Sequence, residues 1–249
     1  MHENIDVMIL AGGYGTRLSS VVADRPKVLA DVKGRPFLSY ILDRLDFFKT
    51  PSVIVCSGYK GDMIIDSFGR RYKGIDLLYS QEREPLGTGG ALKKALELCR
   101  AEWLMVMNGD SFCDADIPSF LKWHDDRGSD CSILLTYMNN AERFGLVETD
   151  EDGKIKAFEE KGRGKSGWIN AGVYIMRRDI IASLPGNTMI SLEKEVFPHL
   201  TGKRFYGYKS YSSFIDIGTP ESYETAEKYF SGKSGKGHAV EVQSWQSEH

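Results

Sequence analysis

Hydrophobic and polar positions divide the first half of the chain into two kinds of segment. Nearly continuous apolar runs stand at 7–10, 52–57, 75–80 and 103–107. Amphipathic stretches lie between them, and the first places Phe37, Ile41, Leu45 and Phe48 at helical spacing. Such runs predict strands covered on both faces, and the spacing between them predicts helices. The alternation therefore predicts a parallel sheet with helices on both sides, a Rossmann-like doubly wound α/β fold.

After about Ser129 the pattern becomes richer in β-type residues. Candidate strands begin near Cys131, Phe144 and Trp168, and the Asp152-Gly153 pair is a strong turn signal within the second of these segments. We expect this part to extend the sheet, which becomes mixed but stays mainly parallel. It should also form a wall of the substrate site.

Helical patterns return near the end of the chain. They cover 191–200 and 221–230, and Pro220 after Thr219 suits a capped helix start. From Ser231 the sequence is rich in Gly, Ser and charged residues, which is typical of a loosely held tail. We therefore expect one domain over 1–230 and a polar tail over 231–249.

Composition narrows the class of protein. The 249 residues are 41% hydrophobic, and no apolar run is long enough to span a membrane. The first residues lack the features of a secretory signal, so we expect a cytoplasmic protein. A net charge of -3 argues against a general nucleic-acid surface. A homo-oligomer is compatible with this composition.

The four cysteines do not suggest a metal or disulfide framework. They are widely separated and form no C-x-x-C pair, so we expect reduced, mostly buried thiols. His124 and His199 fall in helical stretches and are interpreted as packing or surface residues.

The sharpest local motif is LAGGYGTRL at 10–18, directly after the first apolar run and followed by RPKVL at 25–29. Its small residues allow backbone N–H groups to approach phosphate oxygens, while Arg17 and Lys27 supply positive charge. We therefore predict a triphosphate cradle. It comprises Leu10, Ala11, Gly12, Gly13, Gly15, Thr16, Arg17 and Lys27. For an isolated Gly-rich loop, a tight turn that serves geometry alone is the competing interpretation.

Two other nucleotide-binding classes fit poorly. The motif lacks the third glycine of G-x-G-x-x-G, which disfavours a dinucleotide-binding dehydrogenase. The chain has no G-x-x-x-x-G-K-[ST] sequence, which disfavours a P-loop NTPase.

Taken together, the motifs resemble those of the sugar-1-phosphate nucleotidyltransferases. The family signature G-x-G-T-R-L followed by P-K stands here at 13–18 and 26–27. Further matches follow in the family's order: EPLGTGGAL at 84–92, NGDSF at 108–112, FGLVE at 144–148, EEK at 159–161, NAGVY at 170–174 and FIDIGTP at 214–220. The resemblance covers roughly 5–230 and implies a fold similar to GT-A enzymes.

The resemblance implies roles for five charged residues. Arg17 and Lys27 would hold the triphosphate, and Lys161 would hold the phosphate of the sugar 1-phosphate. Asp110 and Asp216 would hold Mg²⁺, which prefers carboxylate oxygens and commonly bridges them to phosphates. Asp110 also follows an apolar strand, where ligand sites of parallel sheets collect. A lone Asp after a strand is otherwise more often a turn former.

Base and sugar contacts follow from the same resemblance. The loop with Glu84, Gly87 and Thr88 would meet the base, and Glu84 could accept from guanine N1–H and N2–H₂. The sugar pocket would comprise Gly145, Glu160 and Asn170 together with Lys161. Without this context, E-E-K would be interpreted as an exposed charged run.

Within the family, the chain looks most like the guanylyltransferases that act on D-glycero-D-manno-heptose 1-phosphate. Pro26-Lys27-Val28-Leu29 departs from the frequent P-K-P-M version but keeps the lysine. Mannose 1-phosphate, and uridylyl, thymidylyl or cytidylyl transfer to another sugar, remain open alternatives. A catalytically silent nucleotide-sugar-binding subunit is an alternative of another class. A glycosyltransferase is disfavoured because Asn108-Gly109-Asp110 is followed by Ser111-Phe112-Cys113-Asp114, so no D-x-D occurs at that site.

Overall fold

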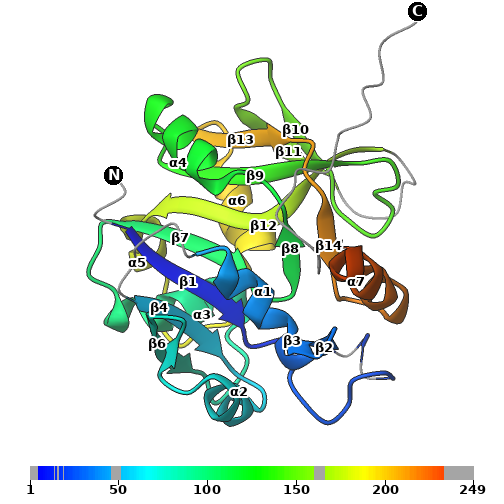
Figure 1. Ribbon diagram of the computed structural model, residues 1–249. Coiled ribbons are helices and arrows are strands. Elements are labelled where there is room, and N and C mark those ends of the chain that lie inside the picture. The colour runs from blue at the N-terminus through cyan, green and yellow to red at the C-terminus, as the bar shows by residue number, and fades with distance from the viewer. Residues whose placement is uncertain are drawn as a thin grey trace, which may run out of the picture.

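An eight-stranded sheet runs through the computed structural model of the chain (Figure 1). The structure describes residues 5–13, 15, 17–18, 20–45, 52–159 and 166–232. The strand order is β13-β9-β12-β7-β1-β4-β6-β5. The strands are β1 (Ile5–Ala11), β4 (Ser52–Ser57), β5 (Arg71–Tyr72), β6 (Ile75–Gln81), β7 (Trp103–Asn108), β9 (Cys131–Met138), β12 (Gly167–Arg177) and β13 (Phe205–Ser210).

The sheet is mixed but mainly parallel, as predicted. β1 pairs in parallel with β4 and β7, β4 with β6, and β13 with β9. β12 runs antiparallel to both β7 and β9 and so joins the two parallel parts. The central strands are buried almost throughout, because helices or hairpins cover both faces and the apolar runs need no polar alternation.

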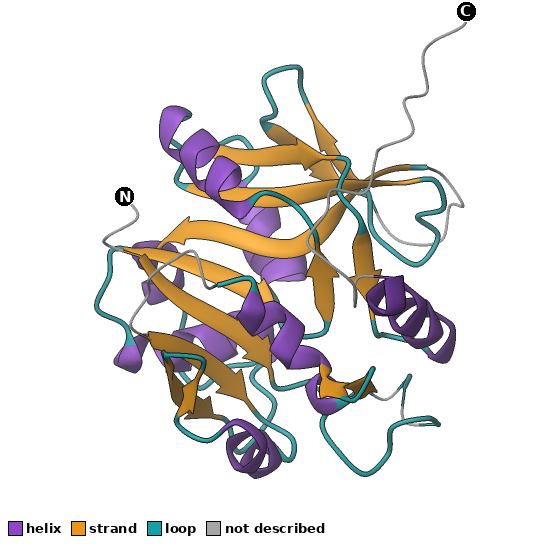
Figure 2. Ribbon diagram, in the orientation of Figure 1, coloured by secondary structure: helices purple, strands orange, loops and turns teal. Residues whose placement is uncertain are grey.

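Two apolar cores lie on opposite faces of the sheet, and Figure 2 shows helices on both of these faces. One is covered by α1 (Phe37–Asp43), α2 (Gly61–Phe68), α4 (Ile117–Asp126) and α7 (Pro220–Gly232). The other is covered by α3 (Gly87–Ala95), α5 (Arg178–Ala182), α6 (Phe197–Leu200), the π-helical turn η4 (Leu192–Val196) and the hairpin of β10 (Val147–Thr149) and β11 (Ile155–Phe158). The doubly wound architecture is therefore confirmed.

The predicted helix over 191–200 is interrupted. Pro198 has no N–H for the helix ladder, and its ring crowds the carbonyl four residues earlier, at Lys194. In place of one continuous helix, the structure has the π-helical turn η4 followed by the short helix α6. Ser191 still caps this segment, because its hydroxyl accepts from Lys194 N at 3.2 Å.

Other predicted boundaries differ at their ends. The helix that begins at Phe37 ends at Asp43, and the predicted position Phe48 lies outside the described residues. Most of the predicted tail, from 233 onward, also lies outside them, while Ser231 and Gly232 complete α7. Within the described part of the chain, no helix is both long and apolar enough to cross a membrane.

Short elements that periodicity did not reveal complete the fold. They are η1 (Lys27–Leu29), β2 (Asp31–Val32), β3 (Arg35–Pro36), η3 (Leu96–Leu98), β8 (Ser111–Cys113) and β14 (Phe214–Asp216). β2 pairs with β3, and β8 pairs with β14, both antiparallel. The β8–β14 pair lies directly after β7 and shapes the candidate site.

Candidate active site

The carboxyl ends of four neighbouring parallel strands meet at one edge of the sheet. Gly12 follows β1, Gly58 follows β4, Glu82 follows β6, and Gly109 follows β7. Gly109 N donates to Leu10 O at 2.8 Å, which joins the ends of β1 and β7. Ligands of open α/β sheets bind at such an edge, so the Gly-rich motif and the Asp110 motif share one site.

A hollow of about 700 Å³ opens beside Gly12 at this edge. Three acidic residues line it, Asp62, Glu82 and Glu84, and they differ in exposure. Glu84, which was predicted to read the base, is exposed at the hollow, whereas Glu82 is half-buried. Glu82 Oε2 accepts from Leu86 N at 2.9 Å, and Oε1 lies against Gly58, whose β-carbon would be 2.8 Å away.

Glu82 is the half-buried acidic residue of the hollow, and the sequence motifs did not include it. Its Oε1 also lies against Gly12, so the carboxylate faces the loop that was predicted to hold the triphosphate. Burial raises the pKa of Glu82 above its ordinary value. Its place immediately after a strand, like that of Gly12, was the signal that could have identified it.

The predicted metal ligands Asp110 and Asp216 are brought together by the β8–β14 pair. Asp216 lies opposite Ser111 in this ladder, and Ile217 N donates to Asp110 O at 3.0 Å. Asp110 and Asp216 are far apart in the sequence, but this pairing places them diagonally opposite each other. Among the described residues, no group of three or more His, Cys, Asp or Glu converges to hold a metal ion.

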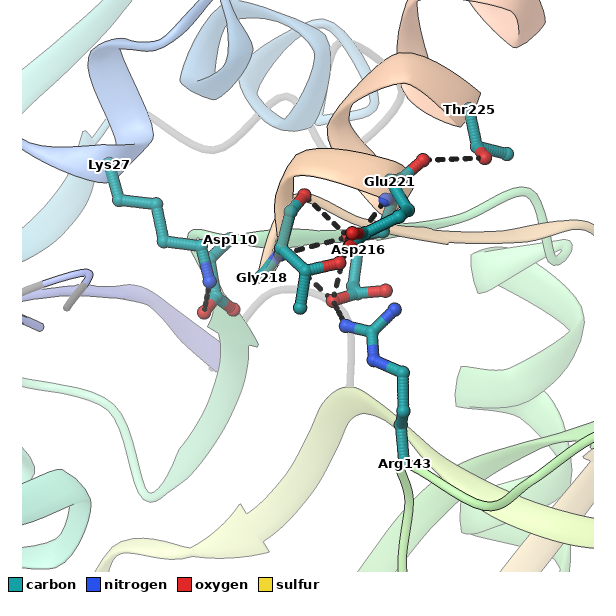
Figure 3. Close-up of polar contacts among 9 residues, drawn as sticks. Lys27, Asp110, Arg143, Asp216, Gly218, Glu221 and Thr225 are labelled. Atoms are coloured by element: carbon teal, nitrogen blue, oxygen red, sulfur yellow. Dashed lines mark hydrogen bonds and ion pairs between the residues drawn. The ribbon is translucent and has the colours of Figure 1, made fainter. Parts of the chain in front are cut away.

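Each of these carboxylates carries a basic partner (Figure 3). Lys27 Nζ lies 2.8 Å from Asp110 Oδ2, and Arg143 lies 2.8 Å from Asp216 Oδ2. A β-carbon on Gly218 would lie 2.5 Å from Asp216 Oδ2 and 3.6 Å from Lys27 Nζ. Lys27 therefore lies near both carboxylates. Arg143 was not predicted, because no motif includes it.

The Gly-rich loop lies beside Lys27. Gly15 has a φ of +62°, and a β-carbon there would lie 3.1 Å from Lys27 Cβ. Arg17 is exposed and makes no hydrogen bond or ion pair with another described residue. Gly13 is also exposed, while Thr16 lies outside the described residues. Gly15 thus places backbone of the loop next to the Lys27–Asp110 pair.

The predicted base loop has a packing role of its own. Gly87 has a φ of +68°, and a β-carbon there would lie 2.5 Å from Ile190 O. The Thr88 hydroxyl donates to Glu193 Oε2 at 2.9 Å and accepts from Leu192 N at 2.8 Å. The base loop therefore packs against Ile190 and the first residues of η4, and only a glycine at position 87 allows this close approach.

Asn170, a predicted sugar contact, stands at an irregularity of β12. The register with β9 shifts between Asn170 and Tyr174, where Gly172 has a φ of +74°. Asn170 Nδ2 donates to Tyr174 Oη at 2.9 Å, and Asn170 Oδ1 accepts from Gly172 N at 2.8 Å. Burial holds the pKa of Tyr174 well above its ordinary value, so this phenol stays neutral. The amide is held in one orientation.

Gly145 contacts the segment that carries the other sugar candidates. A β-carbon on Gly145 would lie 2.9 Å from Glu159 O, and Glu159 N donates to Leu146 O at 2.8 Å. Glu160 and Lys161 follow in the sequence but lie outside the described residues. Their predicted roles therefore stay predictions.

Known proteins similar to this chain share most of its length. The chain is 40% identical to a D-glycero-α-D-manno-heptose 1-phosphate guanylyltransferase of Aneurinibacillus thermoaerophilus, over 90% of this chain and 97% of that protein. It is 38% identical to the protein of the same name from Campylobacter jejuni, over 88% and 97% respectively.

A solved structure is similar as well. HddC from Yersinia pseudotuberculosis, crystallised in complex with GMP-PN, superposes with a TM-score of 0.81 and 38% identity. The match covers 90% of this chain and 99% of HddC.

The family described as Nucleotidyl transferase matches residues 6–231. This range contains every motif on which the resemblance depends. The chain therefore belongs to the nucleotidyl transferase family, which confirms the assignment made from its motifs.

Proposed function

We propose that this nucleotidyltransferase transfers GMP from GTP to D-glycero-D-manno-heptose 1-phosphate, forming GDP-heptose and releasing pyrophosphate. The observation that carries the proposal is the convergence of Lys27, Asp110 and Asp216 at the carboxyl edge of the sheet, the edge at which the hollow beside Gly12 also opens. The names of the relatives from Aneurinibacillus and Campylobacter support the choice of heptose and of the guanylyl group.

For the base, the geometry supports Glu82 rather than Glu84. Guanine offers N1–H and N2–H₂ side by side, and a carboxylate can accept from both. Glu82 is half-buried, faces Gly12, and is held by Leu86 N, whereas Glu84 is exposed. A carboxylate fixed in this way discriminates more strongly than a mobile one, because a wrong base leaves it unpaired.

We assign Mg²⁺ to Asp110 and Asp216. Mg²⁺ is usually held by one or two carboxylates plus substrate phosphates and keeps several waters, so a site with two carboxylates fits it. Both carboxylates already pair with a cationic group, which shows that each of them attracts positive charge in this site. When bound, the ion would neutralise charge that develops on the phosphates.

The transfer itself is a displacement at the α-phosphorus of GTP. An oxygen of the sugar phosphate forms the new P–O bond, and the bond to the pyrophosphate oxygen breaks. Lys27 and Arg17 would hold the triphosphate, and Lys161 would hold the attacking phosphate. Because that phosphate is ionised at neutral pH, the reaction needs no general base. Catalysis then consists of positioning and charge neutralisation.

The sugar would lie on the β12 side of the site. Asn170 is fixed by Tyr174 and Gly172, so its amide can present one orientation to a hydroxyl group. Gly145 would leave room for the ring, and Glu160 would accept from sugar hydroxyls.

The proposal is tested by identifying the product. The protein would be incubated with Mg²⁺, GTP and D-glycero-D-manno-heptose 1-phosphate, and the products separated for mass spectrometry. GDP-heptose should form with the wild type and be lost with Asp110→Asn and Asp216→Asn. Absence of GDP-heptose from the wild-type reaction would contradict the proposal.

A further inference from the structure

Arg143 is a cation at the site that the proposed chemistry does not use. It lies in the loop between β9 and β10, and its guanidinium contacts the Asp216 carboxylate at 2.8 Å (Figure 3). The Arg143 side chain is 41% exposed, whereas that of Asp216 is 17% exposed. An exposed, long side chain thus reaches in to a mostly covered carboxylate.

The carboxylate of Asp216 does not depend on Arg143 for its orientation. Its Oδ2 also accepts from Gly218 N at 2.9 Å and lies 3.4 Å from Ser222 Oγ. Among the described residues, all hydrogen bonds that the Asp216 carboxylate accepts end on Oδ2. What Arg143 adds is therefore mainly positive charge rather than geometry.

The position of Arg143 also suits a second, anionic partner. It lines a hollow of about 310 Å³ next to Asp216, and its guanidinium lies 5.5 Å from the centre of the Phe144 ring. Gly145, two residues on, abuts Glu159, the last described residue before the predicted phosphate-binding segment. One N–H group of the Arg143 guanidinium donates to Asp216. The other N–H groups of the planar guanidinium are donors suited to phosphate.

We propose that Arg143 exchanges partners during the reaction cycle. In the empty site it neutralises Asp216. Once a divalent cation neutralises that carboxylate, the guanidinium pairs with the phosphate of the acceptor sugar 1-phosphate. This inference rests on the proposed function, because it needs Asp216 to be a metal ligand and a sugar phosphate to be the acceptor.

The exchange predicts opposite effects from one substitution. Arg143→Gln removes a positive charge near the metal ligand, so the free protein should bind a divalent cation about three- to tenfold more tightly. The same change removes a charge-assisted contact, so KM for the sugar 1-phosphate should rise about 10- to 100-fold. KM for GTP should stay within about twofold. A merely structural defect would weaken both interactions.

The test uses Mn²⁺ as the probe, with no substrate present. Free Mn²⁺ would be followed by electron paramagnetic resonance during titration of wild type, Arg143→Gln, Arg143→Lys and Asp216→Asn. Arg143→Lys keeps the charge, so its Mn²⁺ affinity should stay close to that of the wild type. Arg127→Gln is the matched control, because Arg127 stacks on Trp123 at the end of α4.

The outcomes separate the inference from the function on which it rests. Tighter Mn²⁺ binding and a higher sugar 1-phosphate KM in Arg143→Gln would support the exchange. Unchanged or weaker Mn²⁺ binding in Arg143→Gln, with binding lost in Asp216→Asn, would overturn the exchange alone. Equal Mn²⁺ binding by wild type and Asp216→Asn would overturn the metal assignment and the exchange together.

Discussion

Lys27 Nζ lies 2.8 Å from Asp110 Oδ2 and joins the segment after the Gly-rich loop to the carboxyl end of β7. The lysine side chain is 14% exposed and the aspartate side chain 45% exposed. A pair whose carboxylate is open to water in this way contributes about 1 kcal/mol or less to folding, whereas the same ammonium near bound phosphates acts with less screening. The pair therefore has more consequence for catalysis than for stability.

Replacing Lys27 by Met should separate these two effects. Met keeps most of the packed stem, so we expect a melting temperature within a few degrees of wild type, while kcat/KM falls by about 10³-fold or more. Calorimetry and a pyrophosphate assay would measure both. Lys122→Met, which breaks the exposed Lys122–Asp126 pair on α4, serves as the control and should leave both values unchanged. A Lys27→Met enzyme of normal activity would refute the role of Lys27.

Glu82 and Glu84 form a natural pair of variants for base recognition. We expect Glu82→Gln to lower kcat/KM with GTP by about 10- to 100-fold, because the amide places one donor where guanine needs an acceptor. Glu84→Gln should have little effect, since its side chain is exposed at the hollow. Kinetics with GTP, UTP and ATP would compare the two. The reverse ranking would return the role to Glu84.

His124 should make stability depend on pH. Its Nδ1 lies 2.8 Å from Ser132 Oγ, its Nε2 is buried without a partner among the described residues, and burial lowers the pKa of His124 to about 4. In the unfolded chain the pKa of His124 is near 6.5. Between about pH 4 and pH 6.5 the unfolded state therefore binds more protons than the folded state. The stability is complete above about pH 6.5 and is lost as the pH falls toward 4, by about 2 kcal/mol at pH 5.

Urea unfolding at about pH 7.5 and pH 5 would measure this loss. His124→Gln cannot titrate in that range, so its stability should fall by about 2 kcal/mol less than that of wild type between the two conditions. Equal pH dependence of both proteins would show that His124 is not the responsible group.

Gly87 tests the packing of the base loop. Alanine at this position would combine a φ of +68° with a β-carbon 2.5 Å from Ile190 O. We expect a loss of at least about 2 kcal/mol and a melting temperature lower by about 4 to 8 °C. Gly186→Ala is the matched control, because a β-carbon there meets nothing within 4 Å. Equal melting temperatures for the two variants would contradict the packing account.

The sequence was sufficient for the larger elements of the fold. Strands such as β1 and β4 are apolar on both faces, and a continuous run of buried residues remains visible without tertiary information. The interruption at Pro198 was also open to prediction, since proline removes a helical hydrogen bond. The assignment of one helix over 191–200 overlooked this constraint.

The site was predicted less completely, for physical reasons. β8 and β14 are three residues each, too short for a periodic signal, yet their pairing is what brings Asp216 next to Asp110. Motif matching selected Glu84, whereas the choice between Glu82 and Glu84 depends on burial. Arg143 belongs to no motif and is identified only through its contact with Asp216.

The most direct test is steady-state pyrophosphate release with Mg²⁺ for each pairing of nucleotide and sugar. GTP, UTP, dTTP, CTP and ATP would be combined with the 1-phosphates of heptose, mannose, glucose and N-acetylglucosamine. We predict the highest kcat/KM for GTP with D-glycero-D-manno-heptose 1-phosphate. A higher kcat/KM for another pair would contradict the assigned substrates, and no release with any pair would contradict the assigned reaction.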